Sequence, residues 1–208
     1  ANNITAKDIA DMWIHESFTN YSETLFTEFY YGKEAGNEYN VGSRKGIQND
    51  RPIIGHYGVN EEGSGDMYYK ASNMIHSIRH IMHDDNRFRN MIRGLNKDFY
   101  HSTVTTQQIE EYISKAAGIN MSKVFDQYLR TTQIPVLEYE WNADSTRFAY
   151  RWNNCITGFD MPLSLGNIKL QPNTQWQSIV VDADKRRWLQ KDYIERMYYI
   201  KTASATKP

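Results

Sequence analysis

Apolar residues recur at steps of three and four residues through roughly the first two thirds of the chain, a spacing typical of amphipathic α-helices. The first helix is expected from about Thr5 to Tyr31, because Thr5 and Asp8 have the form of a capping box and Gly32 can end a helix. Further helices are expected over about 34–49, 66–82, 88–99, 105–118 and 120–134. The helix at 105–118 has the clearest signals, a capping box at its start and a glycine at its end.

A glycine-rich stretch interrupts this pattern between the second and third predicted helices. Pro52 and the surrounding glycines favour an extended loop that continues to Asp66, which is expected to cap the next helix. A loop of this length inside a compact domain is usually functional or mobile.

The pattern changes at Pro135 from helical spacing to alternation. Val136–Trp141 and Arg147–Trp152 alternate, and shorter strands are expected over 168–170, 176–181 and 197–200. Short strands separated by turn residues indicate a small antiparallel β-sandwich. The predicted fold class is therefore α+β, with a helical part over residues 1–134 and a β-sandwich over 135–208.

Composition narrows the functional classes. The chain has 208 residues, of which 40% are hydrophobic, so it can form a packed core. Its net charge of -1 gives no general attraction to nucleic acid or to an anionic membrane, and it has no apolar run of about 18 residues that could span a bilayer. Its single cysteine, Cys155, rules out an internal disulfide and fits a bacterial cytoplasmic or periplasmic protein equally well.

Two groups of residues have the chemistry of a binding site, but the sequence pattern favours a structural role for each. His76, His80 and His83 have a spacing that could bind zinc, yet on a helical wheel they lie about 140° from the apolar stripe, which indicates a solvated polar face. The tail is rich in aromatic residues, among them Trp141, Trp152, Trp176 and Trp188, which could bind sugars or proteins, but alternation predicts that most of the aromatic residues are core.

A third candidate site combines Glu16 in the first helix with Tyr68 after the glycine-rich loop. A carboxylate on a helix can bind a metal, and a phenol can donate a hydrogen bond to a developing oxyanion. Spacing alone leaves both residues open to a purely structural interpretation.

The residues around Glu16 and Tyr68 carry a family resemblance. The segment Trp13-Ile14-His15-Glu16-Ser17-Phe18 resembles the W-L-N-E-G-F segment of M1-family zinc aminopeptidases, the gluzincins related to aminopeptidase N. Met67-Tyr68-Tyr69-Lys70-Ala71 resembles the V-Y-E-K-G segment of that family, and Phe125–Leu129 resembles the end of its helical region. The resemblance covers most of residues 1–135, and beyond them it is positional only.

The resemblance implies a zinc site with ligands from H-E-x-x-H and from a glutamate that follows after eighteen further residues. This places the third ligand at Glu16 and the oxyanion donor at Tyr68, while Asn20 and Glu23 would orient the histidine ligands. Asn2 to His15 would supply fourteen of the eighteen residues, so the chain would begin just after the H-E-x-x-H motif. Neither H-E-x-x-H nor G-A-M-E-N, which binds the substrate amine in the family, occurs in the sequence.

The resemblance therefore predicts a C-terminal piece of a zinc metallo-aminopeptidase that hydrolyses N-terminal residues from peptides. The 208-residue chain alone is expected to bind no zinc and to be inactive, because one carboxylate cannot replace a three-ligand site. Exposed apolar surface could cause it to self-associate. The alternative is a non-catalytic helical and β-sandwich module that binds other proteins.

Overall fold

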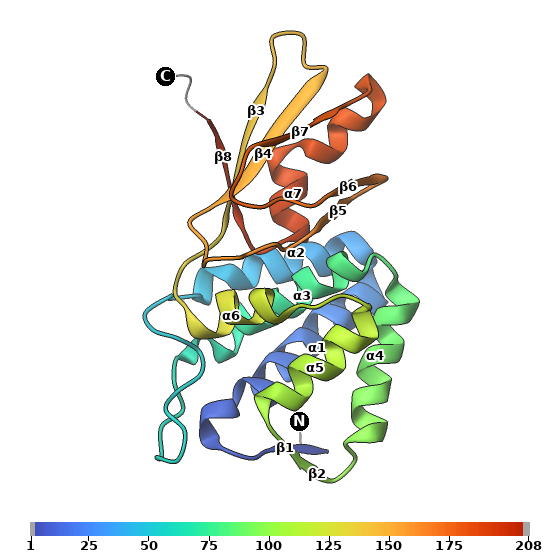
Figure 1. Ribbon diagram of the computed structural model, residues 1–208. Coiled ribbons are helices and arrows are strands. Elements are labelled where there is room, and N and C mark those ends of the chain that lie inside the picture. The colour runs from blue at the N-terminus through green and yellow to red at the C-terminus, as the bar shows by residue number, and fades with distance from the viewer. Residues whose placement is uncertain (1–2, 206–208) are drawn as a thin grey trace.

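The computed structural model describes residues 3–205, in which a helical region is followed by a region of short strands (Figure 1). The helices of the first region are α1 Trp13–Tyr31, α2 Lys33–Ser43, α3 Tyr69–Met82, α4 Asp85–Asp98, α5 Thr106–Ala117 and α6 Ser122–Arg130. Short 3₁₀ helices occur at η1 Ile9–Asp11, η2 Arg44–Gly46 and η3 Gly65–Met67. No helix within these residues is both long and apolar enough to cross a membrane.

The chain enters this region through a strand and not through the predicted first turn of a helix. Strand β1, Ile4–Ala6, pairs in parallel with β2, Ser102–Val104, and α1 begins only at Trp13. Thr5 therefore caps no helix, and the side chain of Asp8 instead accepts a hydrogen bond from the amide of Ala10 at the start of η1. The partner strand lies far away in the sequence, so local spacing could not reveal the pairing.

Helix α3 is the central element of the helical region, because α1, α2, α4 and α6 all pack against it (Figure 1). Its apolar residues Ala71, Ile75, Ile78 and Met82 are buried, as the periodicity predicted. Its polar residues are buried as well, and most of them bind partners on neighbouring elements. The Nζ of Lys70, for example, donates to the carbonyl of Thr131 at 2.7 Å.

The second region is built on a mixed four-stranded sheet with the order β7-β4-β3-β8. Its strands are β3 Val136–Trp141, β4 Arg147–Asn153, β7 Gln177–Val180 and β8 Lys201–Ser204, and β5 Leu163–Leu165 with β6 Ile168–Leu170 forms a separate hairpin. Strands β3, β4 and β7 are antiparallel, but β8 joins β3 in parallel. The wholly antiparallel arrangement expected from the sequence is therefore only partly present.

The segment before β8 departs most from the sequence-based expectation. Residues 197–200 were expected to form a strand, but Met197 ends helix α7, Lys191–Met197, and the strand begins at Lys201. A second helical element, η4 Ala183–Leu189, precedes α7. The apolar run at 197–200 is buried, and its residues Tyr198 and Tyr199 contact α3 and α6 of the helical region.

Polar contacts join the two regions. The Tyr128 hydroxyl donates to the carbonyl of Tyr199 at 2.7 Å, and the Tyr199 amide donates to Ser77 Oγ at 2.9 Å. Arg44 extends from η2 to the Glu195 carbonyl at 2.6 Å and to Asn73 Oδ1 at 2.7 Å. The predicted boundary near residue 134 falls in the segment between α6 and β3.

The remaining helix predictions are confirmed in outline. Thr105 and Gln108 form the expected capping box of α5, and Gly118 ends the helix with a φ of 71°. Gly32 ends α1, and the segment between η2 and η3 contains no regular element, as its glycines predicted.

Arg79 on α3 gives a stability prediction. Its side chain is only 2% exposed, and it binds both oxygens of Glu28 on α1, at 2.6 and 2.9 Å, as well as Asp85 at 2.8 Å. Arg79→Ala should lower the free energy of unfolding by about 3–5 kcal/mol, because the largely buried Glu28 carboxylate loses both of its short bonds and keeps only Arg89 at 3.5 Å. Urea unfolding measures this, and Arg93→Ala on the exposed face of α4 is the control, with an expected change below about 0.5 kcal/mol.

Candidate functional site

Glu16 lies in the first turn of α1, and buried contacts fix the start of that helix. Trp13 is 1% exposed, and its Nε1 donates to Thr106 Oγ1 at 2.7 Å. The Asp11 carboxylate, also 1% exposed, accepts hydrogen bonds from the Thr106 hydroxyl at 2.5 Å and from the Thr106 amide at 3.3 Å. The first turn of α1 is thereby tied to the first turn of α5.

Tyr68 lies between η3 and α3, and a buried carboxylate holds the turn that precedes it. Asp66 is 2% exposed and accepts hydrogen bonds from the amides of Gln48 at 2.8 Å and Asn49 at 2.7 Å. Asp66 was expected to cap the following helix, but its carboxylate instead binds this earlier segment, and Ser64 caps η3. Tyr68 itself is 42% exposed, so its phenol is accessible.

Helix α1, which carries Glu16, packs against η3 and α3, the elements on either side of Tyr68. The pKa of Tyr68 is raised, chiefly by partial loss of solvent and further by the negative charges of Glu16 and Glu62. The phenol therefore keeps its proton at neutral pH and can donate a hydrogen bond.

Asn20 and Glu23 follow Glu16 on the same side of α1. Asn20 Nδ2 lies 3.4 Å from Glu23 Oε2, and the Tyr39 hydroxyl on α2 donates to the same oxygen at 2.6 Å. This hydrogen bond to Glu23 is the largest contribution that raises the pKa of Tyr39 to about 12. The two bonds hold the Glu23 carboxylate in place between α1 and α2.

Among the residues that differ from the M1 pattern are His15, Ser17 and Ala71, and the structure accounts for two of these three. His15 turns away from Glu16, and its Nε2 accepts a hydrogen bond from the Ala6 amide at 2.8 Å. Ser17 on α1 and Ala71 on α3 stand where the family has glycine, and both are fully buried. Small side chains at these positions suit the close packing of α1 on α3. The Ser17 hydroxyl has no hydrogen-bond partner among the described residues, and nothing in the structure explains the choice of serine.

The residues present fit one corner of a metal site. The Glu16 carboxylate is half-buried and has no hydrogen bond or ion pair within residues 3–205, whereas the nearby carboxylates of Asp11 and Glu23 are hydrogen-bonded. Within the same range, no three His, Cys, Asp or Glu side chains are grouped so that they could hold a metal ion. A metal ion bound to Glu16 would therefore need its further ligands from outside these residues.

The interpretation of His76, His80 and His83 as a solvated face is wrong for two of the three. His76 is 0% exposed, and its Nδ1 lies 3.1 Å from the Tyr21 hydroxyl. The His80 ring packs on that of His76 with their centroids 4.6 Å apart, and only His83 is exposed, in a left-handed C-cap position. The wheel argument failed because α3 is covered on its polar side as well.

The tail aromatics divide as expected for a core, with one exception. Trp152 is 1% exposed, while Trp141 and Trp188 are partly buried. Trp176 is 43% exposed, and the Arg151 guanidinium lies 4.7 Å from its ring centroid.

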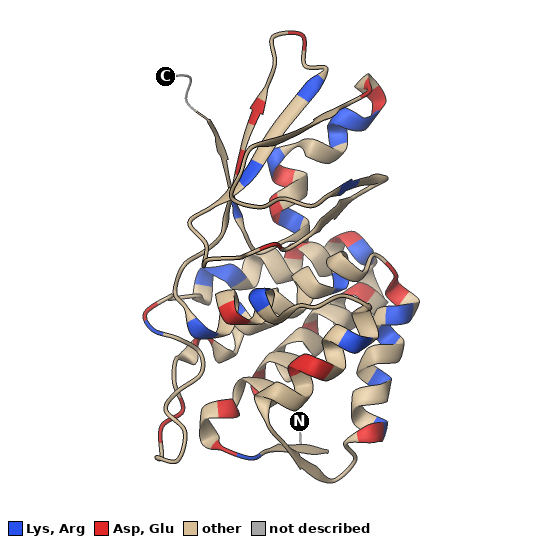
Figure 2. Ribbon diagram, in the orientation of Figure 1, with Lys and Arg blue, Asp and Glu red and all other residues tan. Residues whose placement is uncertain are grey.

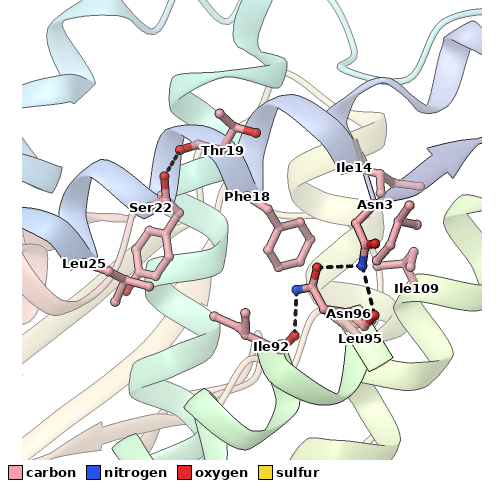
Figure 3. A pocket seen from close by; sticks show the side chains of 12 residues that line it. Asn3, Ile14, Phe18, Thr19, Ser22, Leu25, Ile92, Leu95, Asn96 and Ile109 are labelled. Atoms are coloured by element: carbon pink, nitrogen blue, oxygen red, sulfur yellow. Dashed lines mark hydrogen bonds between the residues drawn. The ribbon is translucent and has the colours of Figure 1, made fainter. Parts of the chain in front are cut away.

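A cavity of about 320 Å³ lies between α1, α4 and α5, on the side of α1 opposite Glu16 (Figure 3). Apolar side chains dominate its lining, among them Ile14, Phe18, Leu25 and Ile92, and Asn3 donates to Asn96 at its rim. Neither Glu16 nor Tyr68 lines it, so it is separate from the candidate site.

The chain belongs to peptidase family M1, because the model of the peptidase family M1 domain matches residues 1–128. No curated protein matches the chain.

Solved structures with a similar fold include two peptidases. Aminopeptidase A of Legionella pneumophila is similar over 99% of this chain, with a TM-score of 0.68 and 13% identity. An M1 zinc metallopeptidase of Deinococcus radiodurans, a glutamate-to-alanine mutant bound to a Tyr-Ser-Ala substrate, is similar over 60% of this chain, with a TM-score of 0.51 and 20% identity. The chain spans 25% of the length of the first protein and 28% of the second.

The buried histidines predict how stability depends on pH. Burial is the main cause that lowers the pKa of His76 well below its ordinary value and that of His80 to about 3. Because the unfolded chain binds protons at these residues from about pH 6.5 downward and the folded chain does not, stability should fall as the pH falls below 6.5. His80 alone should contribute about 1.4 kcal/mol per pH unit in this window.

Urea unfolding at several pH values between 7.5 and 4.5 tests this expectation. His80→Leu should flatten the profile, whereas His101→Asn, at an exposed histidine with a φ of 50°, should leave it unchanged. A wild-type stability profile that is flat from pH 7 to pH 5 would contradict the lowered pKa values of His76 and His80.

Proposed function

We propose that this chain is part of a zinc-dependent metallo-aminopeptidase and that Glu16 is the carboxylate ligand of its zinc ion. Membership of peptidase family M1 and the likeness to an M1 zinc metallopeptidase support a metallopeptidase. The observation that carries the proposal is the half-buried Glu16 carboxylate, which lacks a partner within residues 3–205 and lies near a protonated phenol. A peptide with a free N-terminus is the proposed substrate.

Each residue of the proposed site has a task that its surroundings support. Bound Zn²⁺ supplies Lewis acidity to a water and to the substrate carbonyl. Tyr68 donates a hydrogen bond to the oxyanion that develops on the substrate, and its raised pKa favours the protonated form that this needs. Asn20 and Glu23, held by each other and by Tyr39, orient the histidine ligands supplied by the H-E-x-x-H motif of the family.

We further propose that residues 1–134 are the helical part of an M1 catalytic domain and that residues 135–208 form a separate domain. The M1 domain model ends at residue 128, close to this boundary, and the Deinococcus structure is similar over only 60% of the chain. The second part is then a small β-rich domain of the sandwich type, which packs on α6 through Tyr128 and on α3 through Ser77.

A second candidate function is a non-catalytic interaction module. Exposed aromatic residues at the end of α1 favour it, because Phe26, Phe29 and Tyr30 are 60%, 80% and 62% exposed. Exposed apolar groups in such a cluster commonly mark an interface, which could join two copies of this chain. Finding no H-E-x-x-H in the gene upstream of Asn2 would favour this function over the first.

Substitutions at Glu16 and Tyr68 in the full-length protein test the catalytic proposal. Glu16→Ala should weaken zinc binding, because it removes one of the ligands. Tyr68→Phe should retain zinc and lower kcat by about 10²- to 10³-fold, the scale for losing one oxyanion donor. Metal analysis by mass spectrometry and peptide hydrolysis kinetics measure the two effects.

Tyr69→Phe is the matched control for Tyr68→Phe, since the two adjacent phenols are similarly exposed at 39% and 42%. It should leave kcat unchanged. Full activity of Tyr68→Phe combined with loss of activity in Tyr69→Phe would show that the neighbouring tyrosine is the donor.

The 208-residue chain itself should not hydrolyse peptides. It contains neither H-E-x-x-H nor G-A-M-E-N, so it lacks two metal ligands, the general base and the amine-binding residue of the family. Aminoacyl chromogenic substrates with added zinc test this directly, and zinc-dependent turnover by the chain alone would refute the expectation.

A further inference from the structure

Residues 54–63 form a narrow arm that projects from the helical region between η2 and η3 (Figure 1). Its two sides meet at Gly55 and Gly63, where a Cβ on Gly63 would lie 2.2 Å from the Ile53 carbonyl and 2.7 Å from the Gly55 amide nitrogen. Gly63 also has a φ of 76°, so glycine is required there on both counts. The base of the arm is therefore too close-packed to accept a side chain at Gly63.

Hydrogen bonds hold this base against the helical region. The Ile53 amide donates to the carbonyl of Leu129 at 2.9 Å, and the Ser64 amide donates to the carbonyl of Pro52 at 3.1 Å. Arg51 Nη2 donates to the Gly63 carbonyl at 2.6 Å. The arm thus starts and ends at fixed points, and Gly63 is only five residues before Tyr68.

The tip of the arm is bound separately to the segment that leads into α1. The Tyr57 hydroxyl donates to Asp11 Oδ1 at 2.7 Å, and the Gly58 amide donates to Asp8 Oδ2 at 2.9 Å. Partial burial, followed by the hydrogen bond to Asp11, raises the pKa of Tyr57 to about 12, so this donor persists across the physiological range. The Tyr57 side chain is otherwise 55% exposed, which makes its hydroxyl the main attachment of its ring.

Asp11 makes this attachment firm. It is 1% exposed and is already held by the hydroxyl and the amide of Thr106, so its carboxylate cannot follow a moving arm. Five residues after Asp11 the chain reaches Glu16. The arm therefore bridges from the segment that precedes Tyr68 to the segment that leads into α1, the helix of Glu16.

Acidic residues occur on the side of the arm that returns to Tyr68 (Figure 2). Glu61 is paired with His56 at 2.5 Å and lies 3.8 Å from Arg51, whereas Glu62 is exposed and its charge contributes to the raised pKa of Tyr68. The end of the arm is thus close enough to Tyr68 to affect its phenol electrostatically.

We propose that this arm is a wall of the peptide-binding channel and that the Tyr57–Asp11 hydrogen bond is a latch that holds it in the position that admits substrate. The proposal rests on the proposed function and adds Tyr57 and Asp11 as positioning residues. Neither residue touches the reacting atoms, so the latch affects substrate binding and leaves the chemical step to Glu16 and Tyr68. Release of the latch frees the tip but not the base, which keeps its own hydrogen bonds.

Hydrogen exchange of the 208-residue chain tests the latch itself. Tyr57→Phe removes one hydroxyl from an exposed ring, so the fold should persist, and Asp11 keeps both bonds from Thr106. Amides over residues 55–62 should exchange at least about five-fold faster in this variant, the factor that loss of one hydrogen bond of about 1 kcal/mol predicts. Exchange in α1 should not change. Tyr100→Phe is the control, because Tyr100 is 62% exposed and its hydroxyl has no partner within residues 3–205.

Kinetics of the full-length protein test the effect on substrate. Tyr57→Phe should raise KM for a peptide about five-fold and leave kcat within two-fold of wild type, while Tyr100→Phe changes neither. An unchanged KM in an active enzyme, a fall in kcat as large as that of Tyr68→Phe, or unchanged exchange in the arm would each overturn the latch. A wild-type full-length protein that binds zinc but hydrolyses no peptide would instead refute the proposed function, and the channel proposal would fall with it.

Discussion

The structure depends on the burial of a polar helix. Helix α3 is covered on all sides, although it contains Lys70, Asn73, His76 and Arg79. A buried polar group costs free energy unless it is hydrogen-bonded, and a buried charge costs more. Each of these side chains therefore requires a partner at a defined place, and those partners come from α1, α2, η2, α4 and the segment after α6. Packing alone could be satisfied by many arrangements of the surrounding helices, but this set of bonds is satisfied by very few.

The same constraint positions the candidate site, since Tyr68 stands immediately before α3. Lys70 anchors the first turn of the helix to the Thr131 carbonyl, and burial lowers its pKa to about 8, which shows how far it is removed from solvent. Asp66 fixes the preceding turn from the other direction. These two anchors fix the backbone on both sides of Tyr68. The exposed side chain is mobile only about its own torsions, which suits a group that must reach a substrate oxygen.

The helices could be predicted from the sequence because their apolar spacing and caps are local signals, as at Thr105, Gln108 and Gly118. The errors arose where a distant partner decides the structure. Strand β1 depends on β2 almost a hundred residues later, and His76 is buried because Tyr21 and the tail lie over it. For the arm, the sequence predicts only a glycine-rich loop. The hydrogen bond between Tyr57 and Asp11 could not be predicted, because these residues are far apart in the sequence and share no motif. Glu16 and Tyr68 were found through short motifs of the family, which periodicity alone could not distinguish from ordinary helix residues.

Contacts within residues 3–205 fix the backbone on which Glu16 and Tyr68 lie. Trp13 and Asp11 hold the start of α1, and Asp66 holds the turn before Tyr68. None of these contacts uses the Glu16 carboxylate. In the proposed zinc site, the helix that carries the Glu16 carboxylate would therefore already be ordered, so less of the binding free energy would be spent on ordering the protein. This explains why the Glu16 carboxylate can remain without a partner: the contacts that order the first turn of its helix involve other side chains, which leaves its oxygens free for a ligand.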